Sequence, residues 1–301
     1  MRARPTLISI ALATLLGGTA IASCGGAQKV SDSSSTSAAA ASNTSAGDTV
    51  PSTPKPTKPT VSIPASVPTT LKVTDLTVGT GPQAEDGSTV VLHYVGMMSS
   101  DGTEFDNNYD GDPMGVVLGS GGVIPGWEKG LIGVQAGTRR QLDIPNDLAY
   151  GNTSRGDVIK AGDALTFVVD VLAVAPPVST EQEPFTSVAA SASPADQVAS
   201  VDLVDGNGAE WVNGQHGLAN ILVFRADTGA LIQSTYKAGA QDLVLGELLP
   251  GLNEGLQGMK VGGRRQITMP YASAYGDQGN DRLGLPAKTD VVMVIDLVAV
   301  Y

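Results

Sequence analysis

The chain has 301 residues, and its 30 acidic against 18 basic side chains give a net charge of −12. It therefore lacks the basic surface that nucleic-acid binding requires. Because Cys24 is the single cysteine, disulfides within the chain and cysteine-based zinc sites are excluded, and the two histidines are too few for a histidine-rich metal centre. Any catalysis must proceed without a thiol nucleophile and without a metal.

The N-terminal residues have the pattern of a signal peptide. Arg2 and Arg4 precede an apolar run over residues 7–20, which is shorter than the roughly 20 residues that span a bilayer. Small residues follow directly before Cys24, a pattern that resembles a bacterial lipobox. We expect removal of residues 1–23, acylation of Cys24 and an extracytoplasmic location, lipid-anchored to the bacterial cell membrane. An ordinary secretory signal with a chance cysteine is the alternative.

Residues 24–70 are predicted to form a disordered tether. Between residues 31 and 70 the chain has 18 Ser or Thr and six Pro out of 40, with no aromatic residue. Such a composition cannot bury enough apolar surface to offset the entropy of the chain.

The remainder contains an internal repeat. Residues 124–151 and 249–276 align at a constant offset of 125, with 13 identities in 28 positions. Each copy spans about 100 residues, too many for a solenoid unit, so the pattern indicates a duplicated domain. A segment rich in Pro, Ser and Ala separates the copies and is predicted to be a linker.

Alternating apolar residues predict the strands of the first copy. Residues 89–94 and 165–171 alternate as half-buried strands do, and residues 114–118 and 140–144 predict two more. The spacing of Trp127, Leu131 and Val134 predicts one short helix that begins at Pro125. These elements indicate an α+β domain whose sheet buries its apolar face on the helix. His93, opposite to Tyr94 along its strand, is expected to be exposed, and Trp211 of the second copy is expected in the core.

Five motifs of the first copy share the order and spacing of one known family. They are VLHYVG (91–96), DGTEFD (101–106), VIPGW (123–127), AYG (149–151) and FVVDV (167–171).

Over residues 71–174 the first copy thus resembles the FKBP-type peptidyl-prolyl cis-trans isomerases. The family fold is an antiparallel sheet wrapped around a short helix, with a hydrophobic pocket between them. The resemblance implies tandem domains: an isomerase domain at 71–175, a linker at 176–200 and a second FKBP-like domain at 201–301.

The resemblance also implies a site and a reaction. By motif position, the catalytic pocket comprises Tyr94, Phe105, Asp106, Val123, Ile124, Trp127 and Tyr150, with Met114, Ile159 and Val169 as further substrate contacts. In this interpretation Trp127 lies under the prolyl ring, the Tyr150 hydroxyl donates to a substrate carbonyl, the Ile124 N–H holds a flanking carbonyl, and Asp106 orients Tyr94. The reaction is rotation about an X-Pro amide, which breaks no covalent bond and needs no cofactor.

Two departures from the family pattern concern this pocket. Many members carry an Arg shortly after the Phe-Asp pair, whereas residues 109–115 contain no base, and Val169 stands where many members have Phe.

The second copy keeps the frame but not the pocket residues. Trp127 is matched by Leu252, Phe105 by Ile232, Asp106 by Gln233 and Tyr94, in a less certain register, by Ile221, while Leu249 and Tyr275 are retained. We expect a degenerate domain with weak or no isomerase activity.

The expected function is isomerisation of X-Pro bonds in exported proteins as they fold. The implied partners are proline-containing peptides, unfolded exported proteins and macrolides, together with the membrane through Cys24. The alternative is a non-catalytic chaperone, or holdase, that binds peptides in both clefts. A third hypothesis is a calcium site, because D-x-N-x-D-G at residues 106–111 matches the start of an EF-hand loop, although Val117 occupies the position of the bidentate Glu.

Overall fold

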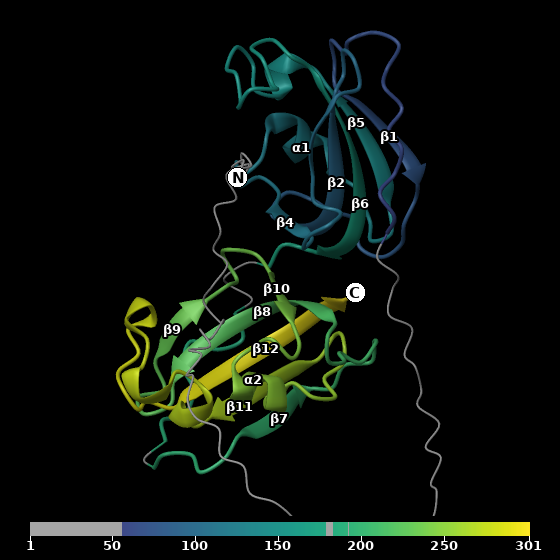
Figure 1. Cartoon of the computed structure of the whole chain (residues 1–301). Coiled ribbons are helices and arrows are strands. Elements are labelled where there is room, and N and C mark those ends of the chain that lie inside the picture. The colour runs from purple at the N-terminus through teal and green to yellow at the C-terminus, as the bar shows by residue number, and fades with distance from the viewer. Residues whose placement is uncertain (1–55, 179–182, 192) are drawn as a thin grey trace, which may run out of the picture.

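The computed structural model of the chain describes residues 56–178, 183–191 and 193–301 (Figure 1). The expected signal peptide, Cys24 and residues 24–55 of the expected tether lie outside the described residues. Within the described part, no helix has the length and apolar character needed to cross a bilayer.

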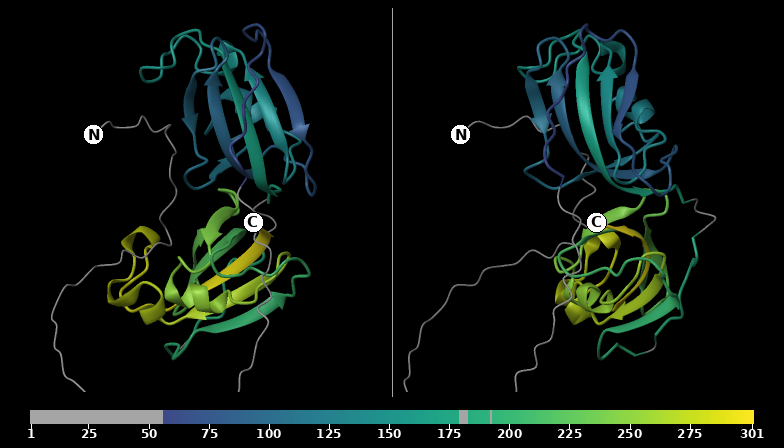
Figure 2. Two further views of the ribbon diagram at one scale, coloured as in Figure 1. Left: turned by 45° about the vertical axis from the view of Figure 1, so that its right-hand side comes forward. Right: turned by 90° about the vertical axis from the view of Figure 1, so that its right-hand side faces the viewer.

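The first domain is a six-stranded antiparallel sheet curved around one short helix, as the sequence predicts (Figures 1 and 2). The strand order is β1-β5-β6-β2-β3, and β4 also pairs with β2. The elements are β1 (Lys72–Thr77), β2 (Thr89–Met98), β3 (Glu104–Asn107), β4 (Met114–Val117), α1 (Pro125–Gly130), β5 (Arg139–Ile144), the 3-10 turn η1 (Asn146–Leu148) and β6 (Leu165–Ala175).

The second domain repeats this topology strand for strand. Its order is β10-β8-β12-β11-β7, with β9 also paired to β8. The elements are β7 (Ala199–Val204), β8 (His216–Arg225), β9 (Leu231–Ser234), β10 (Gln241–Val244), α2 (Pro250–Gly255), β11 (Arg264–Met269), the 3-10 turns η3 (Tyr271–Ser273), η4 (Gly276–Gln278) and η5 (Asp281–Leu283), and β12 (Val291–Val300). Trp211 is fully buried, which confirms its predicted place in the core.

The outer face of the first sheet, remote from α1, is covered by chain that precedes β1. Val61, only 9% exposed, packs against Val95, Tyr109 and Val168. Gln141 Nε2 also donates to the Ser62 carbonyl over 2.9 Å. We call residues 57–63 the first strap. Part of the segment that composition assigns to the tether therefore packs on the domain.

The covering of this outer face changes two expectations. Strand β2 is buried on both faces rather than half-buried, and His93 is 3% exposed, so the expectation of an exposed His93 is wrong. The His93 ring stacks on Tyr109 at a centroid distance of 5.3 Å. Alternation identifies the two faces of a strand, but a distant segment decides whether both are covered.

The linker contains a corresponding strap. Phe185 and Val188 pack on a buried cluster of the second domain that includes Phe224 and Tyr236. The Val188 N–H donates to the Gly229 carbonyl over 3.0 Å. We call residues 183–191 the second strap. The repeated unit therefore includes a strap as well as a sheet and helix.

The two domains meet in a small apolar junction near the C-terminus (Figures 1 and 2). Val91, Ala173 and Ala175 of the first domain form one buried cluster with Leu218 and Ala240 of the second. Partly buried side chains from β6, β12 and Tyr301 surround it. The approach is close, since a Cβ on Gly239 would lie 2.5 Å from Thr89 Oγ1.

Candidate active site

The predicted pocket residues of the first domain, called the first cleft below, gather where the inner face of the sheet packs on α1. Nine of the ten predicted pocket residues belong to the same apolar cluster. Tyr94, Trp127, Ile159 and Val169 are buried members, and Phe105, Met114, Val123, Ile124 and Tyr150 are partly buried and pack against them. The tenth, Asp106, is bonded to Tyr94.

Trp127 is the centre of an aromatic cluster. Pro125 begins α1, so Trp127 lies in its first turn, with only 3% of its surface exposed. Its ring meets Tyr94 edge to face at 5.3 Å and Phe167 at 5.2 Å. The Phe105 ring meets Phe167 at 5.5 Å, with the ring planes 88° apart. These are favourable aromatic geometries, and the ring contacts restrict the rotation of each ring.

Phe167 is a residue of this cluster that the pocket assignment did not include. It lies on β6 two positions before Val169, so both side chains point to the inner face of the sheet. The aromatic ring absent at position 169 is thus supplied from position 167. Its signal in the sequence was the shared parity of 167 and 169 within one strand.

Gly96 makes room for this aromatic pair. A Cβ at this position would lie 2.6 Å from the Phe105 ring and 2.8 Å from the Phe167 ring. Both rings would have to move before any larger residue could replace Gly96. The cluster therefore depends on a glycine of the VLHYVG motif.

The carboxylate of Asp106 has Tyr94 as its hydrogen-bond partner. The Tyr94 hydroxyl donates to Asp106 Oδ2 over 2.7 Å, and burial together with this bond raises the pKa of Tyr94. Tyr94 remains neutral over the whole physiological range, so it acts as a fixed donor. The predicted orienting bond between Asp106 and Tyr94 is present, with no Arg needed to complete it.

Tyr150 offers an unused donor at the edge of the cleft. It follows η1, and its hydroxyl has no hydrogen-bond partner among the described residues. Burial raises its pKa, so the hydroxyl retains its proton. Arg155 lies over the ring at 5.1 Å from its centroid. A substrate carbonyl could accept from this hydroxyl without displacing a protein partner.

The Ile124 N–H is a second available donor. Ile124 caps α1 with an extended backbone, and its carbonyl accepts from the N–H groups of Trp127 and Glu128. Within the described residues its own N–H has no acceptor. The glycine-rich rim before it is held in place, because the Glu128 carboxylate accepts from Gly119 N–H at 2.6 Å and Gly121 N–H at 3.0 Å.

The second cleft has the same frame and different side chains. Strand pairing places Tyr94 opposite Val169 and Ile221 opposite Ile295, at equivalent positions of the two sheets, which confirms the register of Ile221. The replacements of Tyr94, Gly96, Phe105, Asp106, Trp127 and Phe167 are Ile221, Val223, Ile232, Gln233, Leu252 and Met293. Ile232 and Met293 are smaller than the two phenylalanines they replace, and the Val223 side chain adds volume where the first domain has Gly96. The second cleft therefore has aliphatic side chains in place of the aromatic cluster.

Two further features distinguish the second cleft. Leu283 and Leu285, from the loop after Tyr275, are buried in its core cluster. Burial raises the pKa of Tyr275 to about 12. The retained Tyr275 therefore lies in a buried, largely apolar environment.

The EF-hand-like motif is engaged within the fold. Asn108 Oδ1 accepts from the Tyr94 N–H over 2.7 Å, and its amide donates to the Leu92 carbonyl. With Asp106 bonded to Tyr94, two of the motif's side chains fix the strand edge beside the cleft.

Comparison with known proteins identifies relatives over both domains. A family model described as FKBP-type peptidyl-prolyl cis-trans isomerase matches residues 81–172 and 220–298. An FK506-binding protein of Streptomyces anulatus is 44% identical over 120 residues, covering 39% of this chain and 97% of that protein. A probable FK506-binding protein of Corynebacterium glutamicum is 38% identical over 117 residues, covering 38% and 97%. Mouse peptidyl-prolyl cis-trans isomerase FKBP10 is 34% identical over 194 residues, covering 63% of this chain and 30% of that protein.

Proposed function

This chain belongs to the FKBP-type peptidyl-prolyl cis-trans isomerase family, and on that premise we propose that its first domain accelerates X-Pro isomerisation in exported proteins. The observation that carries the proposal is the aromatic cluster of Trp127, Tyr94, Phe105 and Phe167 beside two unused donors. Uncatalysed isomerisation takes tens to hundreds of seconds, which is slow enough to limit folding.

The cleft lowers the barrier to rotation about the X-Pro bond by excluding water from the amide. The barrier of ~18–20 kcal/mol reflects the double-bond character of the C–N bond, which depends on a charge-separated resonance form. A water-excluding aromatic surface disfavours that form relative to the twisted transition state. Each ~1.4 kcal/mol of this preference is worth tenfold in rate.

The two donors orient the substrate. With the prolyl ring over Trp127, the Tyr150 hydroxyl donates to one substrate carbonyl and the Ile124 N–H to another. The Trp127 ring is held by edge-to-face contacts with Phe167 and Tyr94. The rotating amide is thus held at both flanks while its own C–N bond is free to turn. The same cleft would accept macrolides of the FK506 class.

Replacing Tyr150 by Phe in the full chain tests the donor. We expect kcat/KM for a short X-Pro peptide to fall roughly tenfold, the value of one hydrogen bond in a dry site. Tyr275→Phe is the matched control, since it makes the same change in the aliphatic cleft, and we expect no change in rate. Equal losses in both variants would contradict the assignment of activity to the first domain.

The second domain retains the frame without the aromatic cluster, and we infer that it does not isomerise X-Pro bonds. The support is the replacement of Trp127, Phe105 and Phe167 by aliphatic or thioether side chains.

We also propose that the chain is a lipoprotein held at the outer side of the cell membrane through Cys24. The support is the charged, apolar and small-residue pattern of residues 1–24. In an expressing bacterium, Cys24→Ser should move the protein from the detergent-soluble membrane fraction to the medium or periplasm and abolish labelling by a palmitate analogue. Retention of the label would disprove acylation at Cys24.

A further inference from the structure

Arg155 lies at the edge of the first cleft, in the loop that follows Tyr150. The residue is exposed, and its guanidinium carbon lies over the Tyr150 ring, 5.1 Å from the ring centroid. Tyr150 is the side chain to which we assign the hydrogen bond with a substrate carbonyl. A cation therefore lies against the ring that carries this donor.

The loop that carries Arg155 is attached to two of the predicted pocket residues. The Thr153 N–H donates to the Tyr150 carbonyl over 3.1 Å. The Arg155 N–H donates to the Ile159 carbonyl over 2.9 Å, and the Ile159 N–H donates back to the Arg155 carbonyl over 3.3 Å. Ile159 is 5% exposed and belongs to the buried cluster around Trp127. The backbone of Arg155 is therefore held by the cleft itself.

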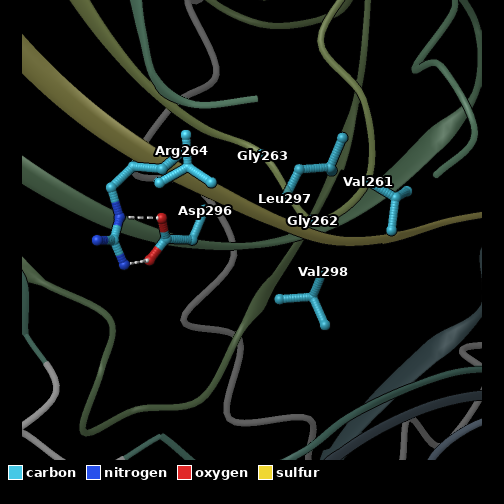
Figure 3. A pocket seen from close by; sticks show the side chains of 8 residues that line it. Val261, Gly262, Gly263, Arg264, Asp296, Leu297 and Val298 are labelled. Carbon is cyan, nitrogen blue, oxygen red and sulfur yellow. Dashed lines mark hydrogen bonds and ion pairs between the residues drawn. The ribbon is translucent and has the colours of Figure 1, made fainter. Parts of the chain in front are cut away.

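Arg155 also differs from most arginines in the described part of the chain, because no carboxylate there pairs with it. Of the seven arginines among those residues, five form ion pairs. These pairs are Arg139–Asp170, Arg140–Asp75, Arg225–Asp227, Arg265–Asp202 and Arg264–Asp296, the last of which is drawn in Figure 3. Arg282, the other exception, belongs to the second domain. Arg155 is thus the arginine of the first domain whose charge remains available to a ligand.

The charge of Arg155 acts at the Tyr150 hydroxyl. Burial raises the pKa of Tyr150, the Arg155 guanidinium lowers it, and the Asp106 carboxylate raises it. Asp106 already accepts a hydrogen bond from Tyr94 over 2.7 Å, whereas Arg155 has no such acidic partner among the described residues. The charge left to interact with a substrate beside this hydroxyl is therefore positive.

From this placement we propose that Arg155 is a specificity-determining residue, which favours substrates that carry an acidic side chain directly next to the proline. When Tyr150 holds the substrate carbonyl, such a side chain extends toward the guanidinium. A carboxylate matches the planar fork of an arginine, and opposite charges at this distance attract even near the surface. The inference rests on the proposed isomerase activity of the first domain and specifies its substrate class.

The test compares Glu with Gln next to the proline of short peptides, which are acetylated at the N-terminus and amidated at the C-terminus. One peptide series varies the residue before the proline and the other varies the residue after it. Glu and Gln have nearly the same size, so the ratio of their kcat/KM values reports the charge. With the full chain we expect Glu to be favoured about three- to fivefold in one of the two series, as for a well-formed exposed ion pair. Cis–trans exchange is followed by NMR at peptide concentrations far below KM.

Variants of the loop assign this preference to Arg155. Arg155→Gln should bring the Glu-to-Gln ratio to about one, and Arg155→Lys, which keeps the charge, should restore part of the preference. Lys160→Gln is the matched control, because it removes one positive charge from the same loop at a side chain that donates to the Asp157 carbonyl. It should leave the ratio unchanged. Equal losses in Arg155→Gln and Lys160→Gln would attribute the preference to the net charge of the loop and overturn the proposal.

The Gln peptides separate failure of this inference from failure of the proposed function. If they are accelerated and the Glu-to-Gln ratio is one in both series, Arg155 does not select acidic substrates, and the isomerase activity stands. If none of the peptides is accelerated, the proposed function itself fails, and this inference fails with it. A Lys peptide completes each series. A preference for Lys over Gln would mean that the Asp106 carboxylate dominates the field of the cleft, which also contradicts the proposal.

Discussion

A chain whose first cleft carries the side chains of the second should lose its isomerase activity and remain folded. The six changes are Tyr94→Ile, Gly96→Val, Phe105→Ile, Asp106→Gln, Trp127→Leu and Phe167→Met. We expect kcat/KM to fall by at least about a hundredfold, equivalent to ~2.7 kcal/mol of transition-state stabilisation. The fold should persist because the second domain packs five of the six replacement residues in its core and carries the sixth, Gln233, at the equivalent place on β9. Proline isomerisation assays and a cooperative thermal transition measure the two outcomes.

Partial variants show whether the six residues act as a unit. Gly96→Val alone should lower both the activity and the free energy of unfolding more than an average one of the six changes does. The reason is that the valine side chain would overlap the Phe105 and Phe167 rings. Adding Phe105→Ile and Phe167→Met should restore stability but not activity. If the variant with all six substitutions still accelerates isomerisation at the native rate, the aromatic cluster is not the site of the reaction.

Much of the inner face of each domain could be predicted from the sequence. Alternation in β2 and β6 and the spacing of Trp127, Leu131 and Val134 depend on local geometry, which a sequence displays directly. The repeat predicted the second frame for the same reason. Even Phe167 could have been found, since it shares a face with Val169.

The outer face could not be predicted in this way. Val95 is buried there against Val61 of the first strap, His93 is stacked on Tyr109, and Val91 lies in the junction with the second domain. The Arg139–Thr57 bond and the junction around Ala173 and Leu218 likewise join distant segments. Such contacts depend on how distant segments meet in three dimensions, and the hydrophobic periodicity of a single segment does not predict them.

Arg140 should matter more to stability than any residue of the outer face. Its side chain is 7% exposed and bonds Asp75 of β1 at 2.6 and 3.0 Å. Its Nη1 donates to the carbonyls of Gly130 and Ile132 at 2.8 and 2.9 Å, at the end of α1. One guanidinium therefore joins an edge strand, β5 and the helix that carries Trp127.

The second domain reproduces this arrangement at the equivalent positions. Arg265 bonds Asp202 at 2.6 and 2.9 Å and the carbonyls of Gly255 and Gln257 at 3.1 and 2.7 Å. The pocket residues differ between the copies, whereas this arginine and its four bonds do not. Its role is therefore to hold the helix against the sheet, whatever the cleft contains.

Replacing Arg140 by Met should lower the free energy of unfolding of the first domain by about 3–5 kcal/mol, because two helix-end carbonyls lose their donor in a buried setting. The two tryptophans allow each domain to be followed separately, with Trp127 in the first and Trp211 in the second. In urea, Arg140→Met should move the Trp127 transition to lower concentration, and Arg265→Met the Trp211 transition. Arg140→Lys keeps the charge but not the planar fork, so it should recover only part of the loss. If Arg140→Met leaves the Trp127 transition in place, the guanidinium does not hold α1, and the position of Trp127 must depend on its ring contacts alone.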